Sequence, residues 1–298
     1  MRHLRVLGTV GGVHPVAIPA RPERLPELRE QGYEACLPDD ANLDALVIAT
    51  DTGRHLADAQ NWGDIPLLIE KPLAGAVTPG LVVLADRPNT WVGCCLRFHP
   101  VFDALLTLQP TLDHHRATLI HVECKTDLRT WRPARDYRES YGAREGQGGA
   151  LRELIHEVDY AGWLWGFPDQ VVGQIDAPTT LEMGDEQRAS FSGGQVTFEL
   201  DLGWEGEPSR RAKVLLSDGD VEIDIRHNRL ILNGDDAPVE ANYADLMYER
   251  QAKAFVESAQ GTPHMHMATA RDGLHALQVC DAVRLSSVTG APVSVDYA

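Results

Sequence analysis

Short apolar runs separated by polar and turn residues characterise the first third of the chain. Residues 44–50 (DALVIAT) and 65–70 (IPLLIE) are mainly apolar, which is typical of parallel strands that are covered on both faces. Residues 24–31 and 55–62 show a helical pattern and alternate with these runs. Strands that alternate with short helices predict βαβ units and a doubly wound parallel sheet. Two more strands are predicted at residues 14–20 and 90–98.

The pattern changes after about residue 97, where the strand-like stretches become longer. Turn residues such as SGG and SDGD separate them, which predicts hairpins and a largely antiparallel open sheet. Helical segments interrupt the strands, so we expect an α/β protein with a parallel domain at residues 1–96 and an α+β domain at residues 97–298. The predicted strands are 117–127, 170–176, 188–204 and 212–232, and the predicted helices are 149–165, 243–260 and 270–287.

The composition limits the class of protein and its partners. The chain has 298 residues, 43% of them hydrophobic, which is enough for one large domain or two ordinary ones, each with its own core. It contains no run of about eighteen apolar residues, the length that a transmembrane helix needs. No apolar run follows Arg2, His3 and Arg5, so a secretory signal is not expected. The formal net charge of −17 disfavours nucleic acid and anionic membranes as partners. Five cysteines without a CxxC pair indicate reduced thiols and a cytoplasmic protein.

The stretch IEKPLAG (residues 69–75) is the first with candidate chemistry. A predicted strand ends at Glu70, Lys71 follows, and Pro72 turns the chain away. Because ligands of open α/β sheets lie beyond the carboxyl ends of the strands, Lys71 is a candidate donor to a substrate hydroxyl. An ordinary solvated lysine before a turn is the alternative, and this stretch alone does not exclude it.

The stretch GQGGALRELIHEVDY (residues 146–160) carries a second set of candidates on a predicted helix. Glu153, His156, Asp159 and Tyr160 lie on or near one face, because residues three and four apart are neighbours on a helix. A neighbouring carboxylate fixes the tautomer of a histidine and raises its basicity, so His156 is a candidate proton carrier. The alternative is a core histidine whose hydrogen bond is satisfied by Asp159.

These two stretches and three others resemble one known family. The order and spacing of the motifs match over nearly the whole chain, and EKP combined with the glycine-rich run into HEVDY is the specific part. The chain resembles the glucose-fructose oxidoreductase / inositol 2-dehydrogenase family, called Gfo/Idh/MocA. Residues 131–166 resemble the branch of surface-polysaccharide and nonulosonic-acid pathways. The matching segments are DALVIATDTGRH (44–55), EKPLA (70–74), LRFHP (96–100), WRPARDYRESYGAREGQGGALRELIHEVDYAGWLWG (131–166) and DGLHALQVCDAVRLSSVTGAPV (272–293).

The resemblance implies a fold and a reaction. The fold is a Rossmann-like dinucleotide-binding domain followed by a domain whose open sheet often makes an oligomer interface, so we expect a homodimer or homotetramer. The reaction is a hydride transfer between a nicotinamide and a sugar, sugar-nucleotide or cyclitol carbon. Lys71 matches the lysine that touches the reacting hydroxyl, and His156 matches the general acid/base. Many relatives carry an Asp one turn before this histidine, where the chain has Arg152 and Glu153; we expect Glu153 to be the partner.

The resemblance also assigns contacts to the cofactor. The predicted strand at residues 14–20 corresponds to the second strand of the family. It ends at residues 19–21, which contain Arg21 and no carboxylate. An acidic side chain there selects NAD, whereas a cation accommodates the 2′-phosphate of NADP, so NADP is slightly favoured over NAD. Arg21 as an exposed residue at the start of a helix is the alternative. The predicted cofactor contacts are Arg21, Ala49, Thr50, His55, Glu70, Lys71 and Arg97.

The loop before the predicted helix at residues 149–165 is rich in arginine and tyrosine. Its cations suit a carboxylate or phosphate on the substrate, because an acidic protein needs a local cationic site to bind an anion. An exposed loop whose arginines pair with neighbouring acidic residues is the alternative. The predicted substrate contacts are Arg132, Tyr137, Tyr141 and Asp159.

Several histidines gather near the C-terminus, in HMH (264–266) and at His275. Their spacing lacks a recognisable set of metal ligands. The stretch instead matches the loop before the last helix of the family. We therefore expect no metal site.

The first residues do not supply the phosphate loop that the resemblance implies. RHLRVLG (2–8) matches the end of the family's first helix, and GTVGG (8–12) follows that helix instead of opening it. A glycine-rich loop must open a helix to present its amides to a pyrophosphate. We therefore expect a sheet that is incomplete at its first strand, with the strand and loop encoded upstream of Met1. Closure of the gap by neighbouring strands is the alternative.

Lys71, His156 and the resemblance together predict an NAD(P)-dependent oxidoreductase that acts on a sugar-type carbinol. A variant of this function is an anhydrosugar or sugar-acid transformation through a transient 3-keto intermediate. The alternative class is a non-catalytic ligand-binding or regulatory protein that retains the fold without the phosphate loop. The presence of both Lys71 and His156 favours the enzyme.

Overall fold

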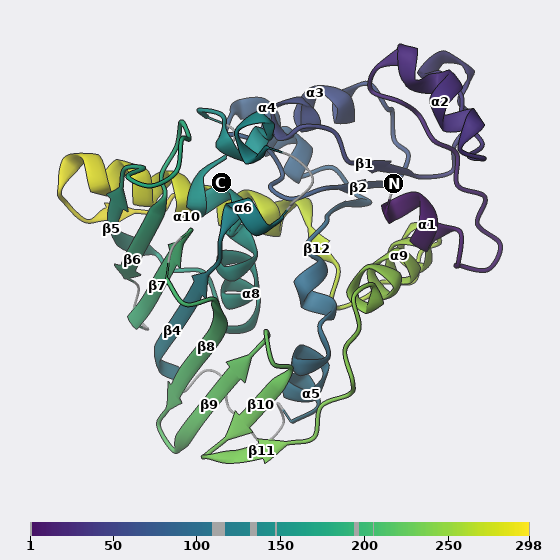
Figure 1. The fold of residues 1–298 in the computed structure, drawn as a ribbon. Helices are drawn as coiled ribbons and strands as arrows, with labels where there is room; N and C mark the ends of the chain where they lie inside the picture. The colour runs from purple at the N-terminus through teal and green to yellow at the C-terminus, as the bar shows by residue number, and fades with distance from the viewer. Residues whose placement is uncertain are drawn as a thin grey trace.

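The structure is a computed structural model that describes residues 2–108, 117–131, 136–146, 148–193, 197–204 and 206–297. Its strands form one sheet of four strands and one of nine. The long helix α10 (Ala270–Thr289) contacts both sheets, at β3 and at β5, and so ties the two parts together (Figure 1). The predicted α/β fold with one parallel and one largely antiparallel sheet is confirmed.

The four-stranded sheet has the order β1-β2-β3-β12. Its first three strands are parallel, and β12 joins β3 in the antiparallel direction. Every residue of β2 is buried, as expected for a central parallel strand with helices on both faces. The elements of this part are β1 (Leu46–Ile48), α3 (His55–Gln60), β2 (Leu67–Ile69), α4 (Pro79–Ala85), β3 (Thr90–Val92) and β12 (Ala268–Thr269).

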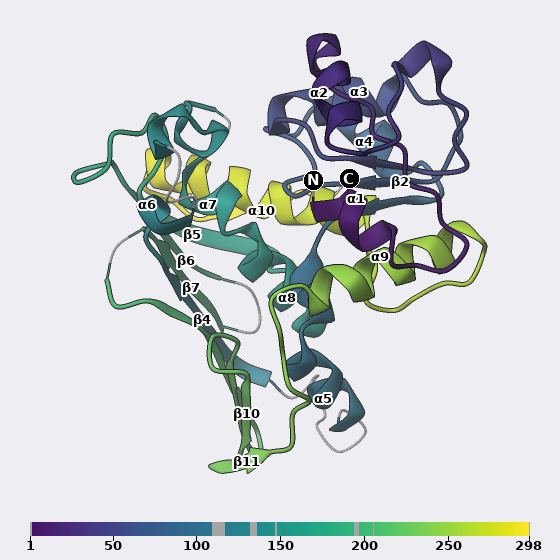
Figure 2. The ribbon, with the colours of Figure 1, turned by 45° about the vertical axis from the view of Figure 1, so that its right-hand side comes forward.

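The nine-stranded sheet has the order β11-β10-β9-β8-β4-β7-β6-β5-β13, and only its β4–β7 pair is parallel. Helices α8 (Ile155–Trp165) and α10 pack against it, on β4 and β5, and lie on the same face (Figure 2). The opposite face carries cross-strand ion pairs such as Lys213–Glu222 (2.5 Å). The strands are β4 (Ala117–Lys125), β5 (Gln170–Asp176), β6 (Arg188–Gly193), β7 (Thr197–Gly203), β8 (Ser209–Leu216), β9 (Gly219–Asp224), β10 (Arg229–Leu232), β11 (Asp235–Ala237) and β13 (Val293–Ser294).

The remaining helices lie in different parts of the molecule (Figure 1). The N-terminal helix α1 packs against α9, and the glycines of residues 8–12 follow it as a turn, as predicted. Within the described ranges, no helix combines the length and the apolar character that a membrane span requires. These helices are α1 (Arg2–Leu7), α2 (Leu25–Glu30), α5 (Pro100–Leu108), α6 (Leu128–Trp131), α7 (Gly149–Glu153) and α9 (Leu246–Ala259).

Two predicted strands are shorter than expected. The strand predicted at residues 14–20 is wrong, because the structure has only a single parallel bridge there, between Ala17 and Ala35. β1 pairs with β2 alone among the described strands, so this segment has no neighbouring strand on which to build a ladder. The strand predicted at residues 90–98 ends at Val92, because the chain turns into the short helix η4 (Cys95–Phe98).

Two other predictions need correction. The helix predicted at residues 149–165 is broken at Leu154 (φ −98°, ψ 26°), which separates α7 from α8. The predicted division between residues 1–96 and 97–298 does not separate the two sheets, because β12 returns to the first one. The C-terminal part of the chain therefore contributes to both cores.

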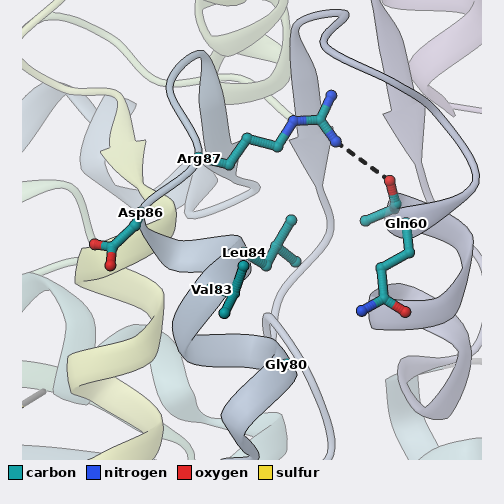
Figure 3. A pocket seen from close by; sticks show the side chains of 7 residues that line it. Gln60, Gly80, Val83, Leu84, Asp86 and Arg87 are labelled. Atoms are coloured by element: carbon teal, nitrogen blue, oxygen red, sulfur yellow. Dashed lines mark hydrogen bonds between the residues drawn. The ribbon is translucent and has the colours of Figure 1, made fainter.

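A shallow groove of about 350 Å³ lies between α3 and α4 (Figure 3). Arg87 crosses its end, donating to the backbone oxygens of Ala59 (3.3 Å) and Ile65 (2.8 Å). None of the lining residues is a predicted site residue, so the groove has no part in the site below. They are Ala59, Gln60, Gly80, Val83, Leu84, Asp86 and Arg87.

Candidate active site

Lys71 connects the first sheet to α7, the helix that directly precedes the His156-bearing α8. β1 and β2 run parallel, so the residues that follow them meet at one edge of the sheet. Lys71 Nζ donates a hydrogen bond to the backbone oxygen of Glu153 (2.9 Å), and it lies 3.6 Å from Glu153 Oε2. The predicted lysine is therefore brought to the predicted helix by a contact across 82 residues of sequence.

Glu153 does not pair with His156, contrary to our prediction. The break at Leu154 ends α7 at Glu153, so the neighbour relation of a continuous helix does not apply. The Glu153 carboxylate lies beside Lys71 instead. Within the described residues, Glu153 Oε1 and His156 Nδ1 are both buried without a hydrogen-bond partner.

His156 is buried near the start of α8. Burial, followed by the positive charges of Lys71 and Arg210, holds the pKa of His156 well below its ordinary value. The imidazole is therefore neutral at neutral pH, and a neutral imidazole can accept a proton.

Glu70 lies between Lys71 and the N-terminal helix. Its Oε1 is 2.6 Å from His3 Nε2, and its Oε2 accepts a hydrogen bond from the Lys71 amide (3.2 Å). Burial raises the pKa of Glu70. The hydrogen bond and charge of His3 and the charge of Lys71 lower it by a larger amount, so the net pKa lies below the ordinary value. The carboxylate is thus held ionised at the edge of the sheet.

The segment after β1 is fastened to the lysine by His55. The two ring nitrogens of His55 lie 2.9 Å from the backbone oxygen of Pro72 and 3.1 Å from that of Thr50. The Thr50 hydroxyl donates to Asp58 (2.7 Å), and the neighbouring Ala49 is exposed. His55 is buried, so its contacts in this structure fix the two strand ends relative to each other.

Arg97 and Asp159, predicted as a cofactor and a substrate contact, lie together. Arg97 Nε and Nη2 donate to the two Asp159 oxygens (2.9 and 2.7 Å). Arg97 also lies 3.4 Å from Asp272 and stacks over the Trp163 ring at 5.0 Å. Burial lowers the pKa of Arg97, but the Asp159 charge and hydrogen bonds more than offset this, so the net pKa of Arg97 lies above its ordinary value. Contacts of either residue with a ligand remain predictions.

The other predicted contacts are exposed, hydrogen-bonded elsewhere or outside the described residues. Arg21 is exposed where the short helix η1 (Pro22–Arg24) begins. The Tyr137 hydroxyl accepts a hydrogen bond from the Glu182 amide (3.0 Å). Arg132 and the side chain of Tyr141 lie outside the described residues. The described residues contain no group of three or more potential ligands that could hold a metal ion.

One charged pair near His156 was not predicted from the sequence. Arg210 of β8 donates through Nε and Nη2 to Glu157 of α8, at 2.6 and 3.3 Å. The two residues are 53 apart in sequence, and no motif connects them. The pairing of β8 with β4 decides which face of the sheet Arg210 occupies, and this register is not visible in the sequence.

No protein-family model matches the chain, and no curated protein matches it either. Solved structures do. The WlbA dehydrogenase from Bordetella pertussis, in complex with NADH and UDP-GlcNAcA, is 18% identical with a TM-score of 0.72, over 99% of this chain and 94% of that one. Levoglucosan dehydrogenase, in complex with NADH and levoglucosan, is 16% identical with a TM-score of 0.78, over 99% and 94%.

A third similar structure is myo-inositol 2-dehydrogenase from Lactobacillus plantarum. It is 19% identical with a TM-score of 0.76, over 99% of this chain and 96% of that one. All three likenesses span both sheets. The chain therefore has the fold of the Gfo/Idh/MocA-type dehydrogenases, as its motifs predict.

Proposed function

We propose that the protein is an NAD(P)-dependent oxidoreductase that transfers a hydride to or from a carbinol carbon of a sugar, sugar nucleotide or cyclitol. One observation carries the proposal: Lys71, at the carboxyl end of a parallel strand, is held against the helix segment that leads to a buried, neutral His156. The similar structures support it, because their dehydrogenases are described with NADH and with sugar ligands.

The carboxyl edge of the first sheet fits the nicotinamide half of the cofactor. The segment at Thr50 and the Glu70 carboxylate follow neighbouring parallel strands, as polar groups for a nicotinamide ribose must. For the pyrophosphate, the described residues include no strand–glycine loop–helix unit, since the glycines of residues 8–12 follow α1. When bound, the nicotinamide would accept or supply the hydride.

The chain's own residues would manage the proton of the carbinol. Lys71 would donate a hydrogen bond from Nζ to the reacting oxygen, with Glu153 keeping the ammonium in place. His156 would take the hydroxyl proton during oxidation and return it during reduction, because its neutral imidazole is the available base. In this mechanism Glu153 would act on Lys71 and would not be the partner of His156.

Lys71→Ala tests this proposal. We expect it to lower turnover about 10²- to 10⁴-fold, the usual contribution of a positioned proton-transfer group, while the protein still binds NADH in a fluorescence titration. Lys253→Ala, at an exposed lysine of α9, is the matched control. A wild-type protein that binds ligand without turnover, and whose binding survives Lys71→Ala, would instead support the non-catalytic binding protein.

The choice of coenzyme and the assembly also remain proposals. Arg21 favours NADP, so Arg21→Ala should weaken NADP binding and leave NAD binding unchanged. The similar structures are described with NADH or NAD, which supports either dinucleotide and not NADP in particular. A homodimer or homotetramer is expected, and sedimentation of the purified protein measures it.

A further inference from the structure

An arginine of the nine-stranded sheet lies beside the candidate active site without a part in the mechanism above. Arg210 lies on the face of β8 that also presents the buried Ala212 and Val214. Its Nε and Nη2 donate to Glu157, at 2.6 and 3.3 Å. Glu157 directly follows His156 on α8, and the charge of Arg210 acts on His156, so Arg210 lies near the proposed proton acceptor.

The two members of this pair differ in exposure. The side chain of Glu157 is 0% exposed, whereas that of Arg210 keeps 27% of its surface exposed. Glu157 engages two of the three guanidinium nitrogens, and Nη1 is not part of the pair. Because a guanidinium carries five N–H donors in a planar fork, the edge with Nη1 can receive a second acceptor.

Two cations lie near His156. Lys71 and Arg210, the charged groups that depress the pKa of His156, are both cations. Their carboxylate partners, Glu153 and Glu157, are each directed at their own cation. The net charge of −17 repels anions from the protein as a whole, so an anionic substrate needs a local cation of this kind.

We propose that Arg210 binds a carboxylate group of the substrate, so that the enzyme acts on sugar acids in preference to the matching neutral sugars. The inference rests on the proposed function, because it names the substrate class of the same site. A guanidinium fork recognises a planar carboxylate by parallel charge-assisted hydrogen bonds. Glu157 holds the fork in place, and the edge with Nη1 selects the acid.

Matched pairs of sugars test the inference. The probes are glucuronate against glucose and galacturonate against galactose, with glucose 6-phosphate as an anion that lacks a carboxylate. Turnover is followed by the absorbance of the reduced nicotinamide, and binding by calorimetry. The variants are Glu157→Gln, the double variant Glu157→Gln/Arg210→Gln, and Arg188→Gln as a control on the half-exposed Arg188 of β6.

The double variant is designed to keep the fold. Removing Arg210 alone leaves the buried Glu157 without its ion-pair partner, which is destabilising. Two glutamines remove both charges together and can hydrogen-bond to each other. Glu157→Gln alone preserves an acceptor for Arg210 and leaves the cation available to the substrate.

We expect the wild type to favour each acid over its neutral partner. The double variant should lose about 10- to 100-fold in kcat/KM and in affinity for the acids alone, the range of a charge-assisted hydrogen bond. Arg188→Gln should keep the preference, and Glu157→Gln, which keeps the cation but loosens its orientation, should weaken it less than the double variant does. Equal losses for acids and neutral sugars, or a wild-type preference for neutral sugars, would overturn the inference. A preference for glucose 6-phosphate that depends on Arg210 would show that Arg210 recognises a phosphate, and it would overturn the proposed recognition of a carboxylate.

Failure of the proposed function has its own readout. A fluorescence titration with NADH reports cofactor binding in the absence of sugar. If no sugar turns over, Arg210-dependent binding of an acid still supports the inference while the dehydrogenase proposal fails. If the wild type binds NADH but neither acid, the inference is overturned and the dehydrogenase proposal stands.

Discussion

Helix α8 carries two carboxylates that pair with arginines from different parts of the molecule, and the pairs differ in their access to water. Asp159 pairs with Arg97 of η4, and their side chains are 2% and 1% exposed. Glu157 pairs with Arg210 of β8, and there the arginine keeps 27% of its side-chain surface exposed. One pair ties α8 to the segment after the first sheet, and the other ties it to the nine-stranded sheet.

The difference separates a structural contact from a candidate ligand contact. Arg97 is enclosed by Asp159, Asp272 and Trp163, so its charge depends entirely on groups of the protein. Arg210 gives two nitrogens to Glu157 and retains contact with water, as a group that exchanges water for a ligand must. Two arginines that pair with carboxylates of the same helix therefore differ in whether a ligand can reach them.

Arg97→Ala should have the largest effect on stability. It leaves Asp159 as a buried, unpaired charge, which costs about 3–5 kcal/mol. Urea unfolding measures the loss, and Arg97→Lys, which keeps the charge and loses the bidentate geometry, is the control. A loss below that of Arg97→Lys would contradict a buried structural pair.

Arg210→Ala should cost less, about 1–3 kcal/mol. The Glu157 carboxylate is as buried as Asp159, but the partly exposed Arg210 site gives water a route to it once the arginine is removed. The same urea experiment measures the effect. Equal losses for the two alanine variants would break the distinction between the pairs.

Two other regions, β2 and residues 14–20, differ in how well the sequence predicted them. β2 was predicted from residues 65–70, because a strand buried on both faces leaves an apolar run in the sequence. Residues 14–20 show a similar run but form only the Ala17–Ala35 bridge. A strand requires a neighbour, and the apolar pattern does not report whether one is present.

The site was predictable where local motifs carry it. Lys71 and His156 followed from EKP and HEVDY, but the break at Leu154 did not, because the apolar pattern continues across it. The break turns Glu153 towards Lys71. Arg210 was missed because its position depends on the register of β8 against β4, and a slip of one residue would turn it to the other face.

Acid should weaken the Arg210 side of the molecule more than the Arg97 side. Burial and the charges of Lys71 and Arg210 hold the pKa of His156 well below its ordinary value, and burial with the charges of Arg210 and Arg250 lowers the pKa of His99 to about 4. The folded state then binds fewer protons than the unfolded chain, whose histidines titrate near about 6.5. Stability is therefore complete above this pH and is lost as the pH falls towards the folded pKa values.

Urea unfolding at a series of pH values measures this loss. In Arg210→Gln both folded pKa values should rise, so the slope of stability against pH becomes shallower between about 6.5 and 4. In Arg97→Lys the slope should match that of the wild type, because Arg97 is not among the groups that shift either histidine. A slope that changes equally in both variants would show that the acid sensitivity is not specific to Arg210.

The smallest effect is a shift of one resonance. Titration of the His156 imidazole by NMR, assigned by its loss in His156→Gln, should give a higher pKa in Arg210→Gln than in the wild type, because one of the two cations beside the ring is removed. Arg97→Lys should leave the resonance and its pKa in place, since Asp159 and Asp272 compensate that charge. A rise in Arg97→Lys as large as in Arg210→Gln would mean that both arginines act on His156 through the position of α8, and Arg210 would lose its separate role.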